Sequence, residues 1–164
     1  MSILPEISLP STPKTPNIRP ISLLYAGILV AFAVTQLFSF TNFQLLVESY
    51  WLPGGAQGAA FLSGIIVVAE VFALPFLLRM KVSIAMRVIS MIFGWLVPLI
   101  WVGINIWSLT TVNALHNIGF LGTVISLEPG WWTLLFSVAI GVLAAWASWG
   151  MWPQFKHPQK KLLK

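Results

Sequence analysis

The chain alternates between long apolar segments and short polar connections. Four apolar segments lie at about residues 21–40, 59–78, 84–107 and 131–152. Each is close to the roughly 20 residues that a helix needs to cross the hydrocarbon core of a bilayer, where only internally hydrogen-bonded backbone is stable. The pattern predicts an all-α protein with a membrane four-helix bundle over residues 21–152, followed by a basic tail at 153–164.

The first twenty residues have a different pattern. Five prolines fall between Leu4 and Pro20, and proline lacks the backbone N–H that a helix interior requires. We therefore expect residues 1–20 to form an extended, proline-rich tail rather than helix.

Composition supports a location in the membrane. The chain is 58% hydrophobic and 8% charged, with a mean hydropathy of +0.89, whereas soluble domains are roughly half apolar and about a quarter charged. There is no cysteine, so the chain alone cannot form a disulfide, a thiolate nucleophile or a cysteine-ligated metal site. The two histidines, His116 and His157, have no companions at metal-ligand spacing, and we expect no metal site.

The positive charges predict the topology. The connections at 41–58 and 108–130 contain no lysine or arginine. All nine basic residues flank the other ends of the segments: Lys14, Arg19, Arg79, Lys81, Arg87, Lys156, Lys160, Lys161 and Lys164. The positive-inside rule then places both termini in the cytoplasm of a multi-pass inner (plasma) membrane protein. The net charge of +5 is explained by topology, so we expect the lipid bilayer and no nucleic acid as its partner.

Aromatic residues gather near the predicted membrane boundaries. Amphipathic rings favour the interface between hydrocarbon and water. We expect Tyr50, Trp51, Trp107, Trp131 and Trp132 at the outer interface, and Trp149, Trp152 and Phe155 at the inner one.

Three stretches carry a resemblance to a known family. They are AVTQLFSFTNFQLLVESYWLP (33–53), VVAEVFALPFLL (67–78) and NIGFLGTVISLEPGWWTLL (117–135). In order and spacing they resemble the MauE branch of the DoxX-like membrane proteins, over roughly residues 20 to 150. The resemblance implies a four-helix membrane protein that helps to mature periplasmic redox enzymes, including disulfide formation in methylamine dehydrogenase during methylamine utilization.

The chain departs from that family at its reactive positions. The family loop commonly reads Asn-Cys-Gly-Cys-Phe-Gly, and the lysine of a Lys-Leu pair ends its first helix. Gln36 stands at the lysine position. The loop motif falls on Asn117, Ile118, Gly119, Phe120, Leu121 and Gly122. Both cysteine positions are thus apolar, and a relay of electrons through thiols is excluded.

The same loop predicts a closed structure. Gly119 and Gly122 can adopt the positive φ of a tight reversal, and apolar side chains gain free energy on leaving water. We expect an apolar lid over the outer mouth of the bundle, between the third and fourth spans, formed by Ile118, Phe120, Leu121, Val124, Ile125 and Leu127. The alternative is that this apolar surface docks a membrane or periplasmic partner.

Glu70 is the one ionisable residue deep in a span. By helical rise it lies within roughly 2 Å of the bilayer centre, where a lone charge costs at least about 2.5–3.5 kcal/mol. Side-chain direction brings Gln36 toward it, so we predict a hydrogen-bonded pair with Glu70 protonated at neutral pH. The indole of Trp95 needs an oxygen acceptor, for which Glu70 is the candidate. Glu70, Gln36 and Trp95 form either a ligand or proton site or a structural contact between helices.

Two further patterns concern helix packing. Ser137, Gly141 and Ala145 recur every four residues on the fourth span, which lets a neighbouring helix approach closely. Pro75 and Pro98 interrupt the backbone hydrogen bonds of the second and third spans.

Three functions are consistent with these patterns. The one we favour is a non-enzymatic integral membrane protein, an accessory or maturation component of a redox system whose active cysteines lie in a membrane or periplasmic partner. The second is a subunit that binds a quinone or another apolar ligand beside Glu70, with quinone then the one cofactor to consider. The third is a small proton-coupled transporter that uses Glu70.

Overall fold

The computed structural model of the chain describes residues 14–111 and 115–152. The regular elements in this part are five helices, α1 (Ile18–Phe38), α2 (Phe40–Glu48), α3 (Gly55–Leu77), α4 (Ile84–Thr110) and α5 (Trp131–Gly150). All but α2 are long and apolar enough to cross a membrane. The predicted all-α membrane four-helix bundle is confirmed. The predicted basic tail, with His157 and Phe155, lies outside the described residues, as do residues 1–13.

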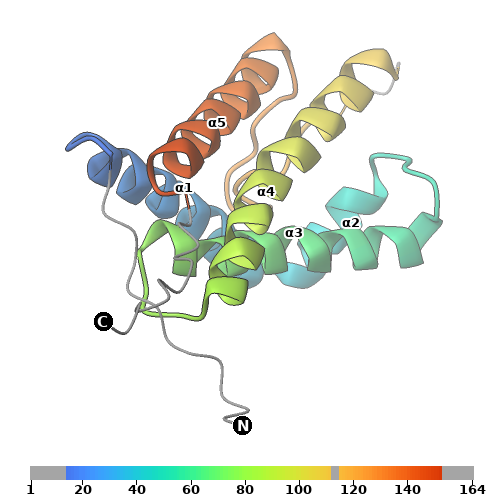
Figure 1. The fold of residues 1–164 in the computed structure, drawn as a ribbon. Coiled ribbons are helices and arrows are strands. Elements are labelled where there is room, and N and C mark those ends of the chain that lie inside the picture. Colours follow the sequence, from blue (N-terminus) through green and yellow to red (C-terminus); the bar gives the residue numbers. More distant parts are fainter. Residues whose placement is uncertain (1–13, 112–114, 153–164) are drawn as a thin grey trace, which may run out of the picture.

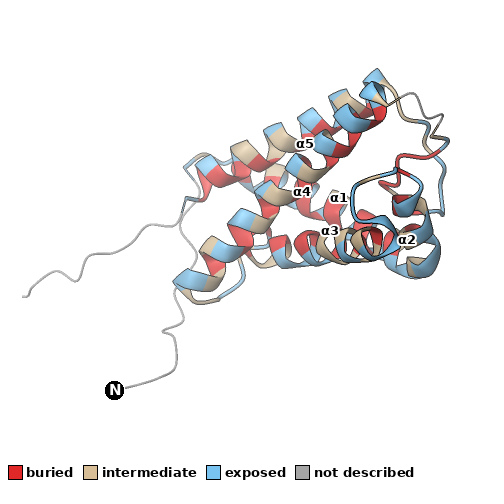
Figure 2. Cartoon of the chain, turned by 90° about the vertical axis from the view of Figure 1, so that its right-hand side faces the viewer, coloured by how far each residue is buried: buried red, intermediate tan, exposed pale blue. Residues whose placement is uncertain are grey.

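The four long helices form a closed arrangement. Helix α3 packs on α4, α4 on α5, and α1 on both α3 and α5. Figure 1 shows the pair α4 and α5 crossing over the pair α1 and α3. In the view of Figure 2 the two pairs spread apart toward one end, where α2 and the connection between α4 and α5 lie. This wider end contains the candidate site described below.

The two ends of the described chain meet at the opposite end of the bundle. The backbone N–H of Lys14 donates to the carbonyl oxygen of Gly150 at 3.2 Å. The ammonium group of Lys14 lies 4.9 Å from the ring centre of Trp149, within cation–π range. The start of α1 and the end of α5 therefore share one side of the bundle, as four crossings require. That this side is cytoplasmic stays a prediction.

Two features at the predicted boundaries differ from expectation. Helix α1 begins at Ile18, so the prediction that no helix precedes residue 21 is wrong. Pro20 lies in the first helical turn, where a missing N–H leaves no hydrogen bond unmade. Helix α2 was not predicted. It has nine residues, too few to cross a bilayer, and it buries Phe43 and Val47 one turn apart.

Side chains of neighbouring helices bond to the backbone at both prolines. Pro98 cannot donate to the carbonyl oxygen of Gly94, and the hydroxyl of Tyr25 on α1 donates to that oxygen instead, at 2.5 Å. Next to Pro75, the backbone N–H of Phe76 donates to the hydroxyl of Ser90 on α4, at 2.9 Å. These contacts tie α1 to α4 and α3 to α4 at the irregular turns, as a dry environment demands.

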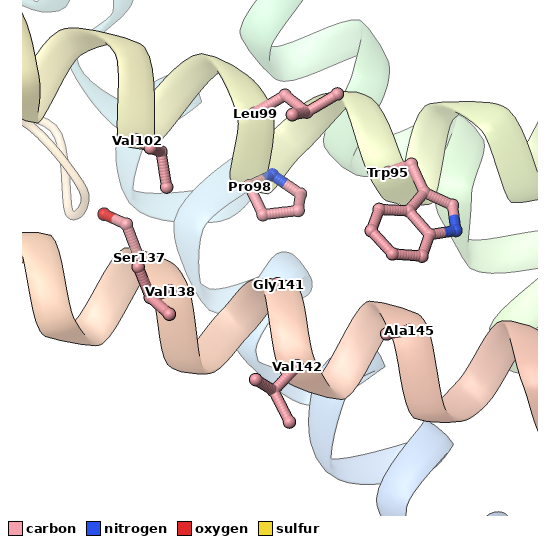
Figure 3. Close-up of a pocket in the computed structure, with 9 residues that line it drawn as sticks. All are labelled: Trp95, Pro98, Leu99, Val102, Ser137, Val138, Gly141, Val142 and Ala145. Carbon is pink, nitrogen blue, oxygen red and sulfur yellow. The ribbon is translucent and has the colours of Figure 1, made fainter.

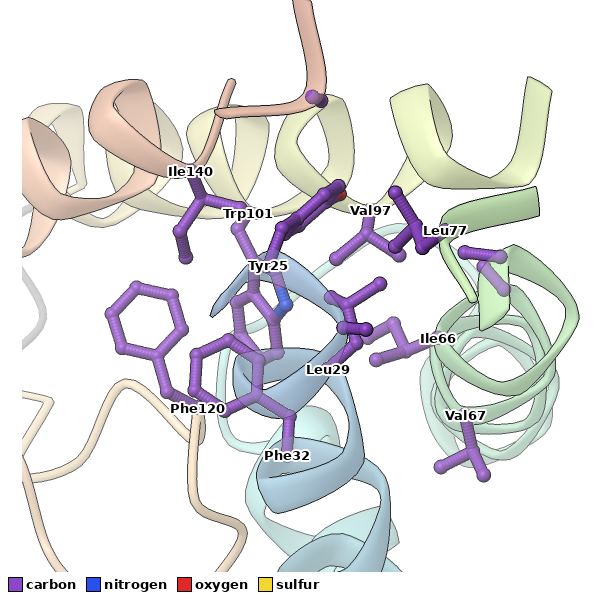
Figure 4. Close-up of a cluster of buried hydrophobic side chains, with 14 of the residues drawn as sticks. Tyr25, Leu29, Phe32, Ile66, Val67, Leu77, Val97, Trp101, Phe120 and Ile140 are labelled. Atoms are coloured by element: carbon purple, nitrogen blue, oxygen red, sulfur yellow. The ribbon is translucent and has the colours of Figure 1, made fainter. Parts of the chain in front are cut away.

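The core lies where the four helices and the α4–α5 connection converge (Figure 4). Phe120 from the connection stacks on Phe32 at a centroid distance of 5.5 Å and packs against Trp101 at 4.7 Å. The ring of Phe136 on α5 meets Phe120 edge-on at 5.3 Å. Many large apolar side chains remain exposed on the outer helix faces, as expected of a surface that contacts lipid.

Candidate functional site

Glu70 and Gln36 form a buried polar pair between α3 and α1, inside the bundle. Glu70 on α3 and Gln36 on α1 are both 0% exposed. The amide nitrogen Nε2 of Gln36 donates to Oε1 of Glu70 at 3.2 Å. The predicted contact between these two residues is therefore confirmed. The partner of the carboxyl group is a neutral amide. Burying a hydrogen-bonded polar group costs less free energy than burying a lone charge.

The same amide also binds the connection between α4 and α5. Nε2 of Gln36 donates its second hydrogen to the carbonyl oxygen of Phe120 at 3.0 Å. One side chain thus joins α1, α3 and the connection at a single point. The sequence did not predict this third partner, because the position of a loop carbonyl follows from the folded loop rather than from residue types.

Three buried polar atoms around this pair lack a hydrogen-bond partner in the described part of the chain. They are Oε2 of Glu70, Oε1 of Gln36 and Nε1 of Trp101. The Trp101 indole approaches the Glu70 carboxyl without a well-formed hydrogen bond. Of these atoms the Trp101 indole N–H is a donor, and the two oxygens are acceptors, one of which belongs to Glu70 itself. That Glu70 is protonated stays a prediction.

The prediction that Trp95 contacts Glu70 is wrong. The indole nitrogen of Trp95 donates to the hydroxyl of Ser148 on α5 at 3.0 Å, and the ring is 38% exposed. The indole N–H does find an oxygen acceptor, but on α5 rather than on α3. Trp95 and Trp101 are six residues apart, so they lie on different faces of α4. Trp101 is the tryptophan that faces the core.

The connection between α4 and α5 is organised by one asparagine. We call its described residues, 115–130, the outer loop. Oδ1 of Asn117 accepts from the backbone N–H groups of Gly119 at 3.0 Å and Leu127 at 3.1 Å, and Nδ2 donates to the carbonyl oxygen of Gly122 at 2.9 Å. The backbone N–H of Ile118 also donates to Leu127 O at 2.7 Å. The loop is therefore a fixed structure closed across its base.

The two residues at the cysteine positions of the family motif face inward. Ile118 and Phe120 are each 0% exposed. The hydroxyl of Tyr50 donates to the carbonyl oxygen of Ile118 at 2.7 Å, and Gln36 holds that of Phe120. Burial raises the pKa of Tyr50 well above its usual value, so its hydroxyl stays a neutral donor. The expectation that Tyr50 anchors at the interface is wrong, since it is 1% exposed.

Gly119 and Gly122 must be glycine because neighbouring atoms lie too close for a side chain at either position. Gly119 and Gly122 have φ of +82° and +58°. A Cβ at Gly119 would lie 2.6 Å from the Tyr50 hydroxyl, and one at Gly122 would lie 3.0 Å from the carbonyl oxygen of Thr35. The glycines thus let the outer loop sit directly on the end of α1 and on Tyr50, which follows α2.

The lid prediction holds for part of the loop. Ile118 and Phe120 are in the core, and Leu121 and Leu127 pack partly against it. Val124 and Ile125 are 50% and 49% exposed, so the expectation that they help to cover the bundle is wrong. They lie between the tight turn at Gly122 and the base at Leu127, where the chain projects outward. The outer loop therefore plugs the bundle and presents an apolar tip.

A separate cavity of about 300 Å³ lies between α4 and α5 (Figure 3). The predicted small-residue row of Ser137, Gly141 and Ala145 lines one side, with Pro98 opposite Gly141. Neither Glu70 nor Gln36 is among its lining residues. Within residues 14–111 and 115–152, no three His, Cys, Asp or Glu side chains gather as a metal site would require.

Comparisons with known proteins identify no relative. No protein-family model, curated protein or solved structure matches this chain.

Proposed function

We propose that this chain is a non-enzymatic accessory component of a membrane redox system, without thiol chemistry of its own. This is the role that the resemblance to the MauE branch implies once the reactive cysteines are absent. The observation that supports it is the outer loop. Asn117, Gly119 and Gly122, which the motif shares, have defined structural roles in the loop, while the side chains at positions 118 and 120 are buried.

The exposed tip of the outer loop is the part available to a partner. Val124 and Ile125 are half exposed at the end of the bundle whose connections carry no lysine or arginine. By the positive-inside rule this end faces the periplasm. Exposed apolar side chains on a rigid support are typical of protein interaction sites. The redox chemistry itself would then lie in a membrane or periplasmic partner.

A quinone site or a proton pathway at Glu70 has less support. The carboxyl is 0% exposed, and Oε1 is occupied by Gln36. The cavity between α4 and α5 is lined mainly by apolar residues of those helices, together with Ser137, and does not reach Glu70. Glu70 is better explained as a structural contact between α1, α3 and the outer loop.

Crosslinking from the loop tip in the native cells tests the proposal. A photo-crosslinking amino acid is placed at Val124 or Ile125, and in a matched control at Phe61, which is 72% exposed on α3 and faces lipid. We expect the loop positions, and not Phe61, to capture a protein with a redox cofactor or a Cys-X-X-Cys pair. Capture of only lipid, or of proteins without redox chemistry, from all three positions would contradict it.

A further inference from the structure

The cavity between α4 and α5 spans the midpoints of both helices, so in a bilayer it lies at the level of the hydrocarbon core. Trp95 and Val102 mark its ends on α4, and Ser137 and Ala145 mark its ends on α5. These stretches include the midpoints of both helices as their bounds give them. Leu99 on its rim is 63% exposed, so the cavity opens to the surrounding hydrocarbon. Its occupant must therefore come from the membrane interior.

The polar groups of the lining are already satisfied within the protein. The Ser137 hydroxyl donates to the carbonyl oxygen of Thr133 at 2.9 Å and accepts from Nδ2 of Asn105 at 2.9 Å. The Trp95 indole donates to Ser148. Each polar side chain of the lining thus already has a partner within the protein, and the other lining residues are apolar. The lining therefore favours a hydrocarbon occupant over a headgroup or a quinone ring.

The cavity is narrow. The stretch from Trp95 to Val102 is roughly 11 Å long at the helical rise. A volume of about 300 Å³ over that length gives a mean cross-section of roughly 27 Å². A helix with its side chains is about 10–12 Å across and occupies roughly 80–110 Å². The cavity is therefore wide enough for a single narrow chain, whereas a transmembrane helix could cover its mouth but not fill it.

We propose that this cavity is a binding site for one acyl chain of a bilayer phospholipid. Gly141 and Ala145 form its floor, because small side chains leave the space open there. Pro98 contributes a wall without a backbone N–H that would need a partner. The site goes beyond the proposed accessory role and is independent of Glu70.

Photo-crosslinking with a defined lipid tests the proposal. The purified chain is placed in bicelles of phosphatidylcholine that carries a diazirine at mid-chain, and the crosslinked residues are mapped. We expect crosslinks concentrated on the cavity residues Trp95, Leu99 and Val142. Crosslinks spread evenly over exposed residues of other helices, such as Val34 and Phe61, would overturn it. This measurement needs no variant.

A variant whose side chain fills the cavity, compared with a control variant outside it, gives a second test. In Gly141→Leu the added side chain occupies the space, and crosslinking at Trp95 and Leu99 should fall at least roughly tenfold. Gly27→Leu is the control, since Gly27 is exposed on α1 and a Cβ there meets no atom within 4 Å. Unchanged crosslinking in a folded Gly141→Leu variant would overturn the site. Concentration-dependent dimers that disappear in that variant would assign the face to a second copy instead.

Discussion

At the scale of single residues, the buried pair of Gln36 and Glu70 could be predicted and its surroundings could not. Two polar side chains on facing apolar helices find few hydrogen-bond partners other than each other. The bond from Gln36 to Phe120 O depends on the folded outer loop. The choice between Trp95 and Trp101 depends on how α4 is rotated. Neither the loop path nor the rotation is encoded in the apolar pattern, because nearly every position of α4 is apolar.

Replacing Glu70 tests its structural role. Glu70→Gln keeps a carbonyl oxygen that accepts from the Gln36 amide, so we expect folding and stability close to those of the parent. Glu70→Leu leaves one Gln36 N–H without a partner and should lower the free energy of unfolding by roughly 1 kcal/mol. Unfolding by denaturing detergent in mixed micelles measures both. Loss of biological activity in a fully folded Glu70→Gln variant would instead indicate proton or ligand chemistry.

The turn at Gly122 gives a second test at this scale. Gly122→Ala places a Cβ at φ +58°, 3.0 Å from the Thr35 carbonyl oxygen, and should cost about 1–3 kcal/mol. Gly103→Ala is the control, because a Cβ there meets nothing within 4 Å and alanine favours a helix. Equal stability of the two variants, measured by the same unfolding assay, would show that the loop is not seated on α1.

At the scale of elements, the four long helices could be predicted from length and hydropathy, and α2 could not. Four of its nine residues are polar, so it lacks the apolar run that marks the long helices. It is separated from α1 by a single non-helical residue, Ser39, with φ −134°. The partners at the prolines could not be predicted either. A proline indicates that one carbonyl oxygen of its helix lacks its usual donor, but it does not indicate which side chain of another helix donates to that oxygen.

Tyr25 provides the test at this scale. Tyr25→Phe removes the hydroxyl that donates to Gly94 O and should lower the free energy of unfolding by about 1 kcal/mol. Thr35→Val is the comparison, since the Thr35 hydroxyl donates to Ala31 O within its own helix, where the backbone bond remains. We expect the Tyr25→Phe variant to lose more stability than the Thr35→Val variant. A smaller loss than in Thr35→Val would leave the interruption at Pro98 without its proposed partner.

At the scale of the whole molecule, the charge pattern and the structure agree on an even number of crossings. Lys14 and Gly150 are hydrogen-bonded at one end, and the outer loop and α2 lie at the other (Figure 2). The orientation in the membrane rests on the nine basic residues. Reporters fused after Lys164 should be active only in the cytoplasm, and one inserted near Gly55 only outside. A reporter after Lys164 that is active outside would reverse the orientation of the loop tip.

The outer loop is a closed apolar plug at the position where the family that the chain resembles has a redox loop. The chain contains no cysteine, so Ile118→Cys, Phe120→Cys and Val124→Cys each introduce a single thiol. The most direct measurement is the rate at which each folded variant reacts with a water-soluble maleimide. We expect fast labelling at position 124 and labelling at least roughly tenfold slower at 118 and 120, where reaction requires local opening. Equal rates at all three positions would contradict it.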